Sequence, residues 1–455
     1  MPTAYPILFV LIALVALATW FIPAGTYDYA DGVPQAGTYH PVEARPQGLG
    51  AMLQAAFSGF YDAVDVCVFI LMVGGFLGVV MKTGAVDAGV AAIIRRLGGR
   101  EKWLIPILMI FFGLGGTTYG MWEETMAFYP LLLPVFLAAG YDAVVGIAVI
   151  LLGAGAGVIA STVNPFATGI AAGFAGVSLG EGLVLRLLQW VIFESAAIWY
   201  VMAYAARVKK NPARSVVGVG AGRLQASMDE TVPFTPRRKA IMAVFTLTFL
   251  LMVYAVVPFD EMGLPLPVLG WWFPELSALF LAAGVIVGLM DRMNEVELAE
   301  TFVGGCADLL GVALIIGISR GITVLMNDGA ITDTVLHWGE EALAGAGPVS
   351  FVLLVYLIYL PLTILIPSSS GLATLSIPII APLGQFAGVG GDLVVTAFQS
   401  ASGLINIITP SAAVVMGALA LGRVPYEKWV KFVWKLLVYF LVLTLLLLIA
   451  GVLLG

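Results

Sequence analysis

Residues 115–125 of this chain read Gly-Gly-Thr-Thr-Tyr-Gly-Met-Trp-Glu-Glu-Thr. This polar centre joins two apolar stretches that together occupy 103–139. A second segment, 349–387, is built in the same way around Pro-Ser-Ser-Ser-Gly at 367–371. Both segments differ from the simple apolar runs elsewhere in the chain, and the fold depends on how they are placed.

The composition places most of the chain in lipid. Hydrophobic residues make up 61% of the 455 residues and charged residues 11%, whereas a soluble domain has about 45–50% apolar and about 25% charged residues. No soluble fold of this size can bury so much apolar surface. We therefore predict an all-α polytopic membrane protein. The lysine and arginine residues are segregated in a few loops, which favours membrane orientation and argues against nucleic acid as a partner.

The distribution of charge orients the predicted spans. The apolar runs long enough to cross a membrane, which takes about 20 residues, are 5–23, 63–82, 183–206, 239–257, 273–290, 302–326 and 432–454. The spans 142–176 and 392–421 are interrupted by polar residues and proline. Basic residues gather at 95–102, 207–239 and 423–431, so these loops are expected in the cytoplasm. The loops 24–50, 258–272 and 328–347 are then external. This map requires 103–139 and 349–387 to be re-entrant hairpins, with the N-terminus inside and the C-terminus outside.

The chain also contains an internal repeat. A span, a hairpin, a broken span and a full span occur in this order twice. At a shift of 245 residues, Ala56-Phe57-Ser58-Gly59 corresponds to Thr301-Phe302-Val303-Gly304, and Pro165 corresponds to Pro410. An odd number of crossings between the halves makes them inverted. Two inverted repeats, each with a hairpin and a broken helix, are typical of secondary transporters.

The predicted organisation has five parts. They are a first transmembrane helix with an external loop (1–50), a first repeat (51–206, hairpin 103–139, broken helix 142–176), a basic cytoplasmic loop (207–238), connecting transmembrane helices (239–300), and a second repeat (301–455, hairpin 349–387, broken helix 392–421).

Four polar interruptions are the candidate site. They are the two hairpin centres and the two broken spans, which carry Ser-Thr-Val-Asn-Pro at 161–165 and Asn-Ile-Ile-Thr-Pro-Ser at 406–411. Proline frees carbonyl groups upstream. Those oxygens and nearby hydroxyls suit Na⁺, while new helix N-termini suit carboxylates. The predicted substrate-binding residues are Thr117, Thr118, Glu123, Glu124, Asn164, Ser368, Ser369, Ser370, Asn406 and Thr409. The predicted ion-binding residues are Ser161, Thr162, Asn164, Thr168, Ser402, Asn406 and Thr409.

The segments 110–130 and 363–384, with the Asn164-Pro165 and Thr409-Pro410 breaks, resemble the ion-transporter superfamily. Within it, nearly the whole chain is similar to the family of C4-dicarboxylate uptake C carriers and basic amino acid antiporters of the arginine/ornithine type. The most specific parts are Gly-Met-Trp-Glu-Glu-Thr (120–125) and Pro-Ser-Ser-Ser-Gly (367–371). The resemblance implies a scaffold domain, a moving transport domain, a homodimer, and Na⁺ or H⁺ coupling with an elevator-like motion. We expect the protein in the inner membrane of a prokaryote.

Charged residues inside the predicted membrane segments are costly and mark function by default. Glu123 and Glu124 repel each other, which favours protonation of one and would allow proton coupling; alternatively, the pair binds a cationic group. Neighbouring helical positions point about 100° apart, so one acid is expected to face the cavity, and we favour Glu124. Arg320 is expected to pair with an acid such as Asp308, with a substrate carboxylate as the alternative. Glu194 is interpreted as a polar contact between helices.

These features predict a secondary active transporter and not an enzyme, since the sequence lacks metal-ligand spacing and an evident nucleophile–base pair. The acid pair, and the absence of basic residues at the four interruptions, favour a small basic or zwitterionic amino acid as substrate. A C4-dicarboxylate or short-chain carboxylate is the alternative, because helix N-termini and hydroxyls bind carboxylates without a basic side chain. Symport and antiport both stay open. We expect no cofactor, and no metal beyond Na⁺.

Overall fold

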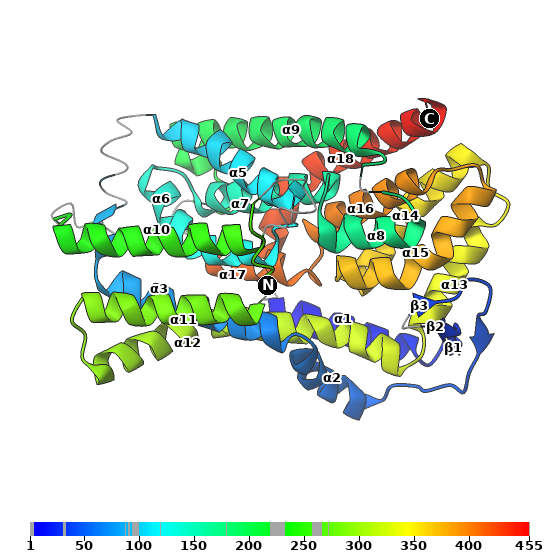
Figure 1. The fold of residues 1–455 in the computed structure, drawn as a ribbon, viewed down its shortest axis with the longest axis horizontal. Coiled ribbons are helices and arrows are strands. Elements are labelled where there is room, and N and C mark those ends of the chain that lie inside the picture. The colour runs from blue at the N-terminus through cyan, green and yellow to red at the C-terminus, as the bar shows by residue number, and fades with distance from the viewer. Residues whose placement is uncertain are drawn as a thin grey trace.

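The computed structural model describes residues 4–454 except 31–32, 87, 90–91, 93–99, 119, 179, 219–232, 257–265 and 272. The described chain is almost entirely helical (Figure 1). Its strands are two very short antiparallel pairs in the loop after the first helix. They join β1 (Gly25–Thr26) to β4 (His40–Pro41) and β2 (Tyr29–Ala30) to β3 (Val33–Pro34). The predicted helical fold is therefore confirmed.

One set of helices, called here the first helix group, packs around a long central helix. Its members are α1 (Ala4–Ala18), α2 (Leu49–Asp62), α3 (Val64–Lys82), α10 (Pro236–Val256), α11 (Phe273–Met290) and α12 (Glu295–Asp328). Helix α12 packs against α1, α2 and α3. Gly74 of α3 and Gly305 of α12 face each other backbone to backbone. Small residues at such positions let membrane helices approach closely.

The remaining long helices form a second helix group around α7 and α16. Its members are α5 (Leu104–Thr118), α6 (Tyr129–Ala138), α7 (Ala143–Ala160), α8 (Ile170–Ala175), α9 (Leu183–Lys210), α14 (Pro348–Leu365), α15 (Ser369–Phe386), α16 (Gly391–Asn406), α17 (Ala413–Leu421) and α18 (Tyr426–Leu454). Helix α7 is apolar on all sides and buried along its whole length. The short turns are η1 (Glu101–Trp103), η2 (Glu123–Phe128), η3 (Pro165–Gly169) and η4 (Pro212–Arg214), and α13 (Thr332–Leu343) links α12 to α14.

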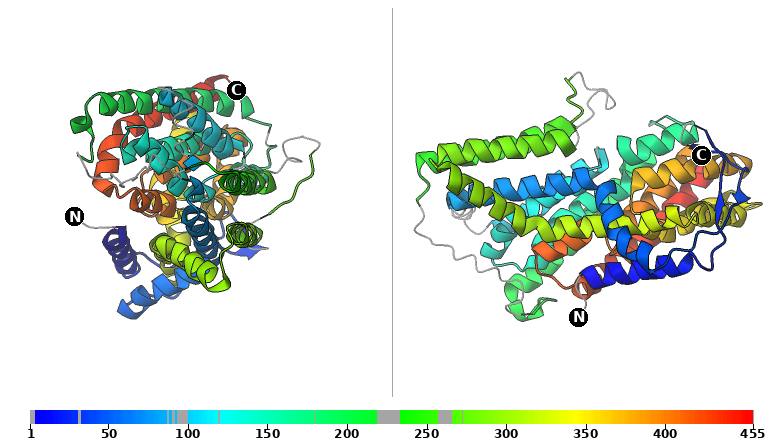
Figure 2. Two further views of the ribbon diagram at one scale, coloured as in Figure 1. Left: turned by 90° about the vertical axis from the view of Figure 1, so that its left-hand side faces the viewer. Right: turned by 90° about the horizontal axis from the view of Figure 1, so that it is seen from below.

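The two helix groups lie side by side. In Figure 1 the first group runs along the bottom and lower left, and the second lies above it and to the right. The left view of Figure 2 shows α1 and α12, coloured dark blue and lime, below most of the second group. The groups meet where α12 packs against α17 and where α3 packs against η2. A solute held at this junction would therefore contact both groups.

The predicted segments agree closely with the helices. The described part contains 7 helices long and apolar enough to cross a membrane, so the chain is a multi-pass membrane protein. Segment 103–139 forms α5 and α6 around a tip, and 349–387 forms α14 and α15. The broken spans end at Ala160 and Asn406 and resume after their prolines. Re-entry, inversion of the repeats and sidedness stay predictions. Most of the predicted loop 258–272 and residues 219–232 of the basic loop fall outside the described residues.

Candidate functional site

The tip of the first hairpin is a tight turn that packs on the broken helix. Helix α5 ends at Thr118, and Gly120 then adopts a φ of +80°. The N–H of Met121 donates to the carbonyl of Gly115 over 3.1 Å, which closes the turn. A Cβ added to Gly120 would lie 2.6 Å from the side-chain nitrogen of Asn164. Glycine therefore satisfies both the left-handed backbone and the close contact with the first break.

The first break, Ser161–Asn164, is a buried cluster of mutually bonded polar groups. Its hydroxyls pair internally, with Ser161 Oγ 2.6 Å from Thr168 Oγ1. Thr117 of the hairpin joins them, because its Oγ1 accepts from the N–H of Thr162 (3.1 Å) and its carbonyl accepts from Thr162 Oγ1 (3.0 Å). Ser161 adopts a φ of 42°, which ends α7 and turns the chain. Hairpin and break thus form one unit of closely spaced oxygens.

The tip of the second hairpin is more open. Helix α14 ends at Leu365, and α15 begins at Ser369 with Ser368 as its N-cap. The side chain of Ser368 accepts from the N–H of Gly371 over 3.2 Å, so it satisfies one free donor of the new helix. Ser368, Ser369 and Ser370 are all partly exposed. These hydroxyls are accessible where those of the first break are buried.

The second break, Ile407–Ala412, is covered by the last helix. Trp429 donates from Nε1 to the carbonyl of Ile407 (3.0 Å), and Tyr426 donates to that of Ile408 (2.7 Å). Within the break, Thr409 Oγ1 lies 2.8 Å from Ser411 Oγ. Sequence analysis did not single out Tyr426 and Trp429. The sequence signal for both was an aromatic ring that carries a hydrogen-bond donor, a few residues before the predicted span 432–454.

At the end of α16, Asn406 is 5% exposed, and its Oδ1 has no hydrogen-bond partner in the described part of the chain. Its amide nitrogen is 3.5 Å from Ser402 Oγ, one turn earlier. The second break therefore retains an unsatisfied acceptor, which is the kind of group that a bound ion or solute satisfies.

The broken helices cross antiparallel at glycines. A Cβ on Gly403 of α16 would lie 2.6 Å from the Cα of Ile159, and one on Gly155 of α7 would lie 2.8 Å from the side chain of Ile407. Gln399 also donates to the carbonyl of Val158 over 2.8 Å. The two breaks are therefore held in a fixed relation to each other inside the second helix group.

A narrow cavity of about 40 Å³ lies where the helix groups meet. The first helix group contributes α3 and α12. The second contributes the first hairpin tip, the start of the second tip and the end of the second break. The lining residues are Val66, Trp122, Glu123, Ile316, Ser319, Arg320, Pro367, Ser411, Ala412, Ala413 and Val414. Three of the four predicted interruptions therefore reach one cavity, and the fourth is bonded to the first tip.

The acid pair is divided between two environments. Glu123 lines the cavity. Glu124 is 7% exposed, and its Oε2 accepts from the N–H of Trp122 over 3.1 Å. The expectation that Glu124 faces the cavity is wrong. The tight turn of η2 bends Glu124 back onto the preceding backbone, so Glu123 is the acid of this pair that lines the cavity.

Arg320 faces the same cavity from α12. Its Nε lies 3.8 Å from Oδ2 of Asp62, and the two side chains are 28% and 52% exposed. The expectation that Arg320 pairs with an acid is confirmed, but the acid is Asp62 and not Asp308, which lines a different cavity. Asp62 lies at the end of α2, which packs on α12, and local spacing in the sequence did not indicate this neighbour.

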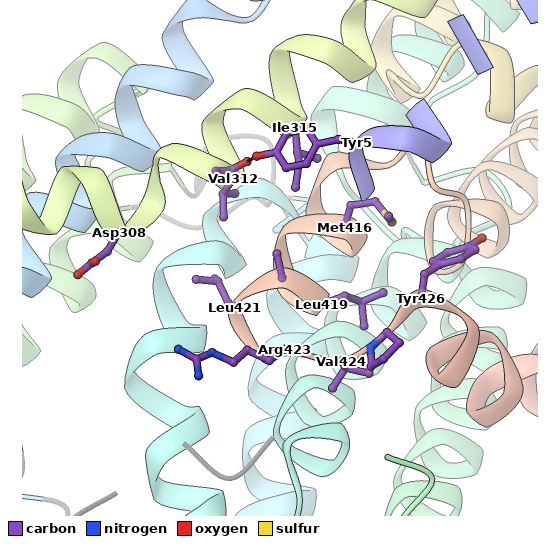
Figure 3. Close-up of a pocket in the computed structure, with 13 residues that line it drawn as sticks. Tyr5, Asp308, Val312, Ile315, Met416, Leu419, Leu421, Arg423, Val424 and Tyr426 are labelled. Atoms are coloured by element: carbon purple, nitrogen blue, oxygen red, sulfur yellow. Dashed lines mark hydrogen bonds between the residues drawn. The ribbon is translucent and has the colours of Figure 1, made fainter. Parts of the chain in front are cut away.

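A larger cavity lies between α1, α12 and the end of α17 (Figure 3). Its volume is about 500 Å³, and most of its lining is apolar. Tyr5 closes one side by donating to the carbonyl of Gly311 over 2.8 Å. Asp308 and Arg423 lie on different walls (Figure 3). A cavity of this kind suits lipid or another apolar group better than a small polar solute.

Glu194 of α9 differs from its interpretation as a polar contact between helices. The side chain is 4% exposed, and its carboxyl packs directly on Gly113 of α5. Neither carboxyl oxygen has a hydrogen-bond partner among the residues that the structure describes. Helices α5 and α9 are in contact at Glu194, but the carboxyl fits there because Gly113 has no side chain.

The other predicted site residues lie behind or beside the cavity. Thr118 bonds back to the carbonyl of Leu114 over 2.6 Å. Thr117, Ser161, Thr162, Asn164 and Thr168 are buried in the first break, and Ser402, Asn406 and Thr409 are buried in the second. Within the described residues, no cluster of histidine, cysteine and carboxylate side chains could hold a metal ion.

The chain is similar to known proteins along its whole length. The sequence model of the family described as "DcuC: C4-dicarboxylate anaerobic carrier" matches residues 1–453. An uncharacterized protein of Haemophilus influenzae is 33% identical over 96% of this chain and 94% of its own length. A protein of Escherichia coli, named "Putative basic amino acid antiporter YfcC", is 31% identical over 95% of this chain and 92% of its own.

Two solved structures are also similar. The YdaH transporter of Alcanivorax borkumensis aligns over 99% of this chain and 98% of its own, with 15% identity and a TM-score of 0.45. MtrF of Neisseria gonorrhoeae aligns over 99% of this chain and 95% of its own, with 17% identity and a TM-score of 0.45.

Proposed function

The chain belongs to the DcuC family of C4-dicarboxylate anaerobic carriers and is a membrane transporter, and we propose that it is a secondary active transporter for a small basic or zwitterionic amino acid. The observation that carries this proposal is the position of Glu123, an acid on the wall of the cavity between the helix groups. An acid at membrane depth is retained only where function or a partner compensates its cost. The substrate ammonium supplies that partner.

Transport follows from the location of the cavity. Its walls come from both helix groups, so movement of the second group relative to the first would carry a bound solute across the membrane. The cavity is narrow, and we propose that it is the closed form of a site that opens during this elevator-type motion. The first helix group would then act as the scaffold and as the contact surface of a homodimer.

Coupling would use the first break. Ser161, Thr162, Thr168 and the carbonyl of Thr117 bring hydroxyl and carbonyl oxygens together in a buried cluster. Such oxygens suit Na⁺ as a coupling ion. Proton coupling through Glu123 and exchange of one amino acid for another are the other outcomes that the uptake experiment below distinguishes.

A C4-dicarboxylate or short-chain carboxylate is the second candidate substrate. Arg320 on the cavity wall favours it, because a guanidinium binds carboxylates. The family's description also names C4-dicarboxylates, whereas the Escherichia coli relative is named for basic amino acids. Glu123 opposes this candidate, because its charge repels a dianion bound in the same cavity.

The experiment is uptake into proteoliposomes. Labelled arginine, lysine, a neutral amino acid and succinate are offered with a Na⁺ gradient, with a pH gradient, or with unlabelled solute inside. We expect amino acid uptake above that of protein-free liposomes, and no inhibition of it by succinate. Counterflow identifies a carrier, since a channel does not exchange. Accumulation of succinate without any amino acid would replace the first candidate with the second.

A further inference from the structure

We propose that Arg320 binds the carboxylate of the substrate, so that a bound amino acid links the two helix groups through its two charges. This inference rests on the proposed function, because it concerns the same cavity and assumes an amino acid substrate. It assigns a specificity-determining role to a residue of the first helix group, whereas the predicted site residues belong to the second.

The guanidinium of Arg320 has unused hydrogen-bonding capacity. Arginine carries five N–H donors. In the described part of the chain, the polar contact of Arg320 is its ion pair with Asp62, at 3.8 Å, which is too long for a hydrogen bond. Asp62 is half exposed and therefore well solvated. The other acid near Arg320 is Glu123, which lines the same cavity and whose charge interacts with the guanidinium. The structure gives no hydrogen bond between these two side chains among the described residues.

A carboxylate matches this cation better than Asp62 does. The planar guanidinium presents paired donors that fit the two oxygens of one carboxylate, with shorter and stronger bonds than a single long ion pair. Arg320 lines the cavity, and Ser319 beside it lines the same wall. A substrate carboxylate would therefore gain directed bonds, and Asp62 would be displaced as a competitor.

The two charges on the cavity wall, one negative and one positive, can each face the opposite charge of a zwitterion. Glu123 is carried by η2 of the second helix group and Arg320 by α12 of the first. An amino acid would place its ammonium near Glu123 and its carboxylate near Arg320. Loss of either contact removes the link between the two helix groups. The first helix group therefore contacts the substrate only when the carboxylate is bound to Arg320. An amine without a carboxylate would bind to one group only.

The test compares an amino acid that the protein accumulates with the amine that lacks its carboxylate, using arginine and agmatine as the first pair. Wild-type protein in proteoliposomes, and Arg320→Gln, Arg320→Lys and Asp62→Asn variants, are assayed for inhibition of labelled arginine uptake by each compound. Wild type should prefer arginine by at least about tenfold, as expected for a charged hydrogen-bonded pair.

The three variants separate binding from structure. Arg320→Gln should remove the preference, and Arg320→Lys should retain part of it, because lysine keeps the charge but loses the paired donors. Asp62→Asn should keep or strengthen the preference, since it removes the competing carboxylate. If Arg320 only paired with Asp62, both removals would weaken uptake alike and leave the arginine-to-agmatine ratio unchanged.

Every outcome decides the proposal. A preference retained in Arg320→Gln, or absent in wild type, overturns it while amino acid transport stands. If Arg320→Gln does not fold, Arg320→Lys decides, together with the ligand-induced shift in the thermal midpoint of wild type, which arginine should raise more than agmatine. If wild type accumulates no amino acid, the proposed function fails and the role of Arg320 falls with it.

Discussion

The two helix breaks differ in how their polar groups are satisfied. At the first break, the backbone N–H groups of Thr162 and Val163 donate to Thr117 of the hairpin, and Ser161 bonds to Thr168. At the second break, Thr409 bonds to Ser411 two residues away, and the freed carbonyls of Ile407 and Ile408 accept from the last helix. The first break is tied to its own hairpin, whereas the second is tied to α18.

The two breaks are therefore expected to respond differently to a ligand. The first break and hairpin form a closed unit that holds its shape without a ligand and carries Glu123 at its edge. The second break leaves Asn406 Oδ1 unsatisfied and places the buried Ser411 on the cavity wall. A buried acceptor without a partner is costly, so ligand binding is expected to change the second break more than the first.

The largest expected effect is on the acid pair of the first tip. Glu123→Gln should lower amino acid accumulation by about tenfold or more, because it removes the charge that faces the cavity. Glu124→Gln should have a mild effect, because a glutamine oxygen can still accept from the N–H of Trp122. Uptake rates of the two variants, normalised to the amount of reconstituted protein, check this. Wild-type uptake rates in both variants would remove the acid pair from substrate recognition.

The two tip glycines give the next largest effect. Gly120→Ala should lower the thermal midpoint by at least about 2 °C, because the left-handed backbone costs about 1–2 kcal/mol with a side chain and the added methyl meets Asn164. Gly371→Ala is the matched control at the second tip. It has no positive φ, and its added Cβ would meet Ser368 at 3.2 Å. Thermal unfolding of both in detergent tests the comparison, which fails if Gly371→Ala is the more damaging.

The smallest expected difference is between variants of two buried threonines, one at each break. Thr117→Val removes the acceptor of the Thr162 N–H and should cost about 1–3 kcal/mol. Thr409→Val removes a short bond to Ser411 Oγ and a longer one, of 3.4 Å, from the N–H of Ser411. It should cost about 1 kcal/mol, because the longer bond is weak. Thr117 and Thr409 are 2% and 3% exposed, so burial is matched. A larger loss of thermal stability for Thr409→Val would show that the second break is the more rigid one.

Sequence analysis predicted the positions of the helices and their breaks better than the contacts between side chains. The hairpin 349–387 and the broken helix 392–421 differ by at most one residue at each end from the helices that form them. Pro165 and Pro410 marked both breaks, because proline interrupts a helix through its own missing N–H. The choice between Glu123 and Glu124 failed, because it assumed regular helix where the chain forms the tighter turn η2. The acid that pairs with Arg320 was also misidentified, since Asp62 approaches from another helix.

The sequence by itself determined that this chain crosses a membrane, where its helices are interrupted, and which residue types gather at the interruptions. Hydrophobic length, proline position and charge segregation are local properties, so they can be read without a fold. Only the tertiary structure decided that Glu123 and Arg320 share one cavity and that Thr117 closes the first break. Those contacts join segments far apart in the chain, and they depend on how glycines let α7, α16 and α5 approach one another. Packing of whole helices, and not local pattern, sets which polar groups meet.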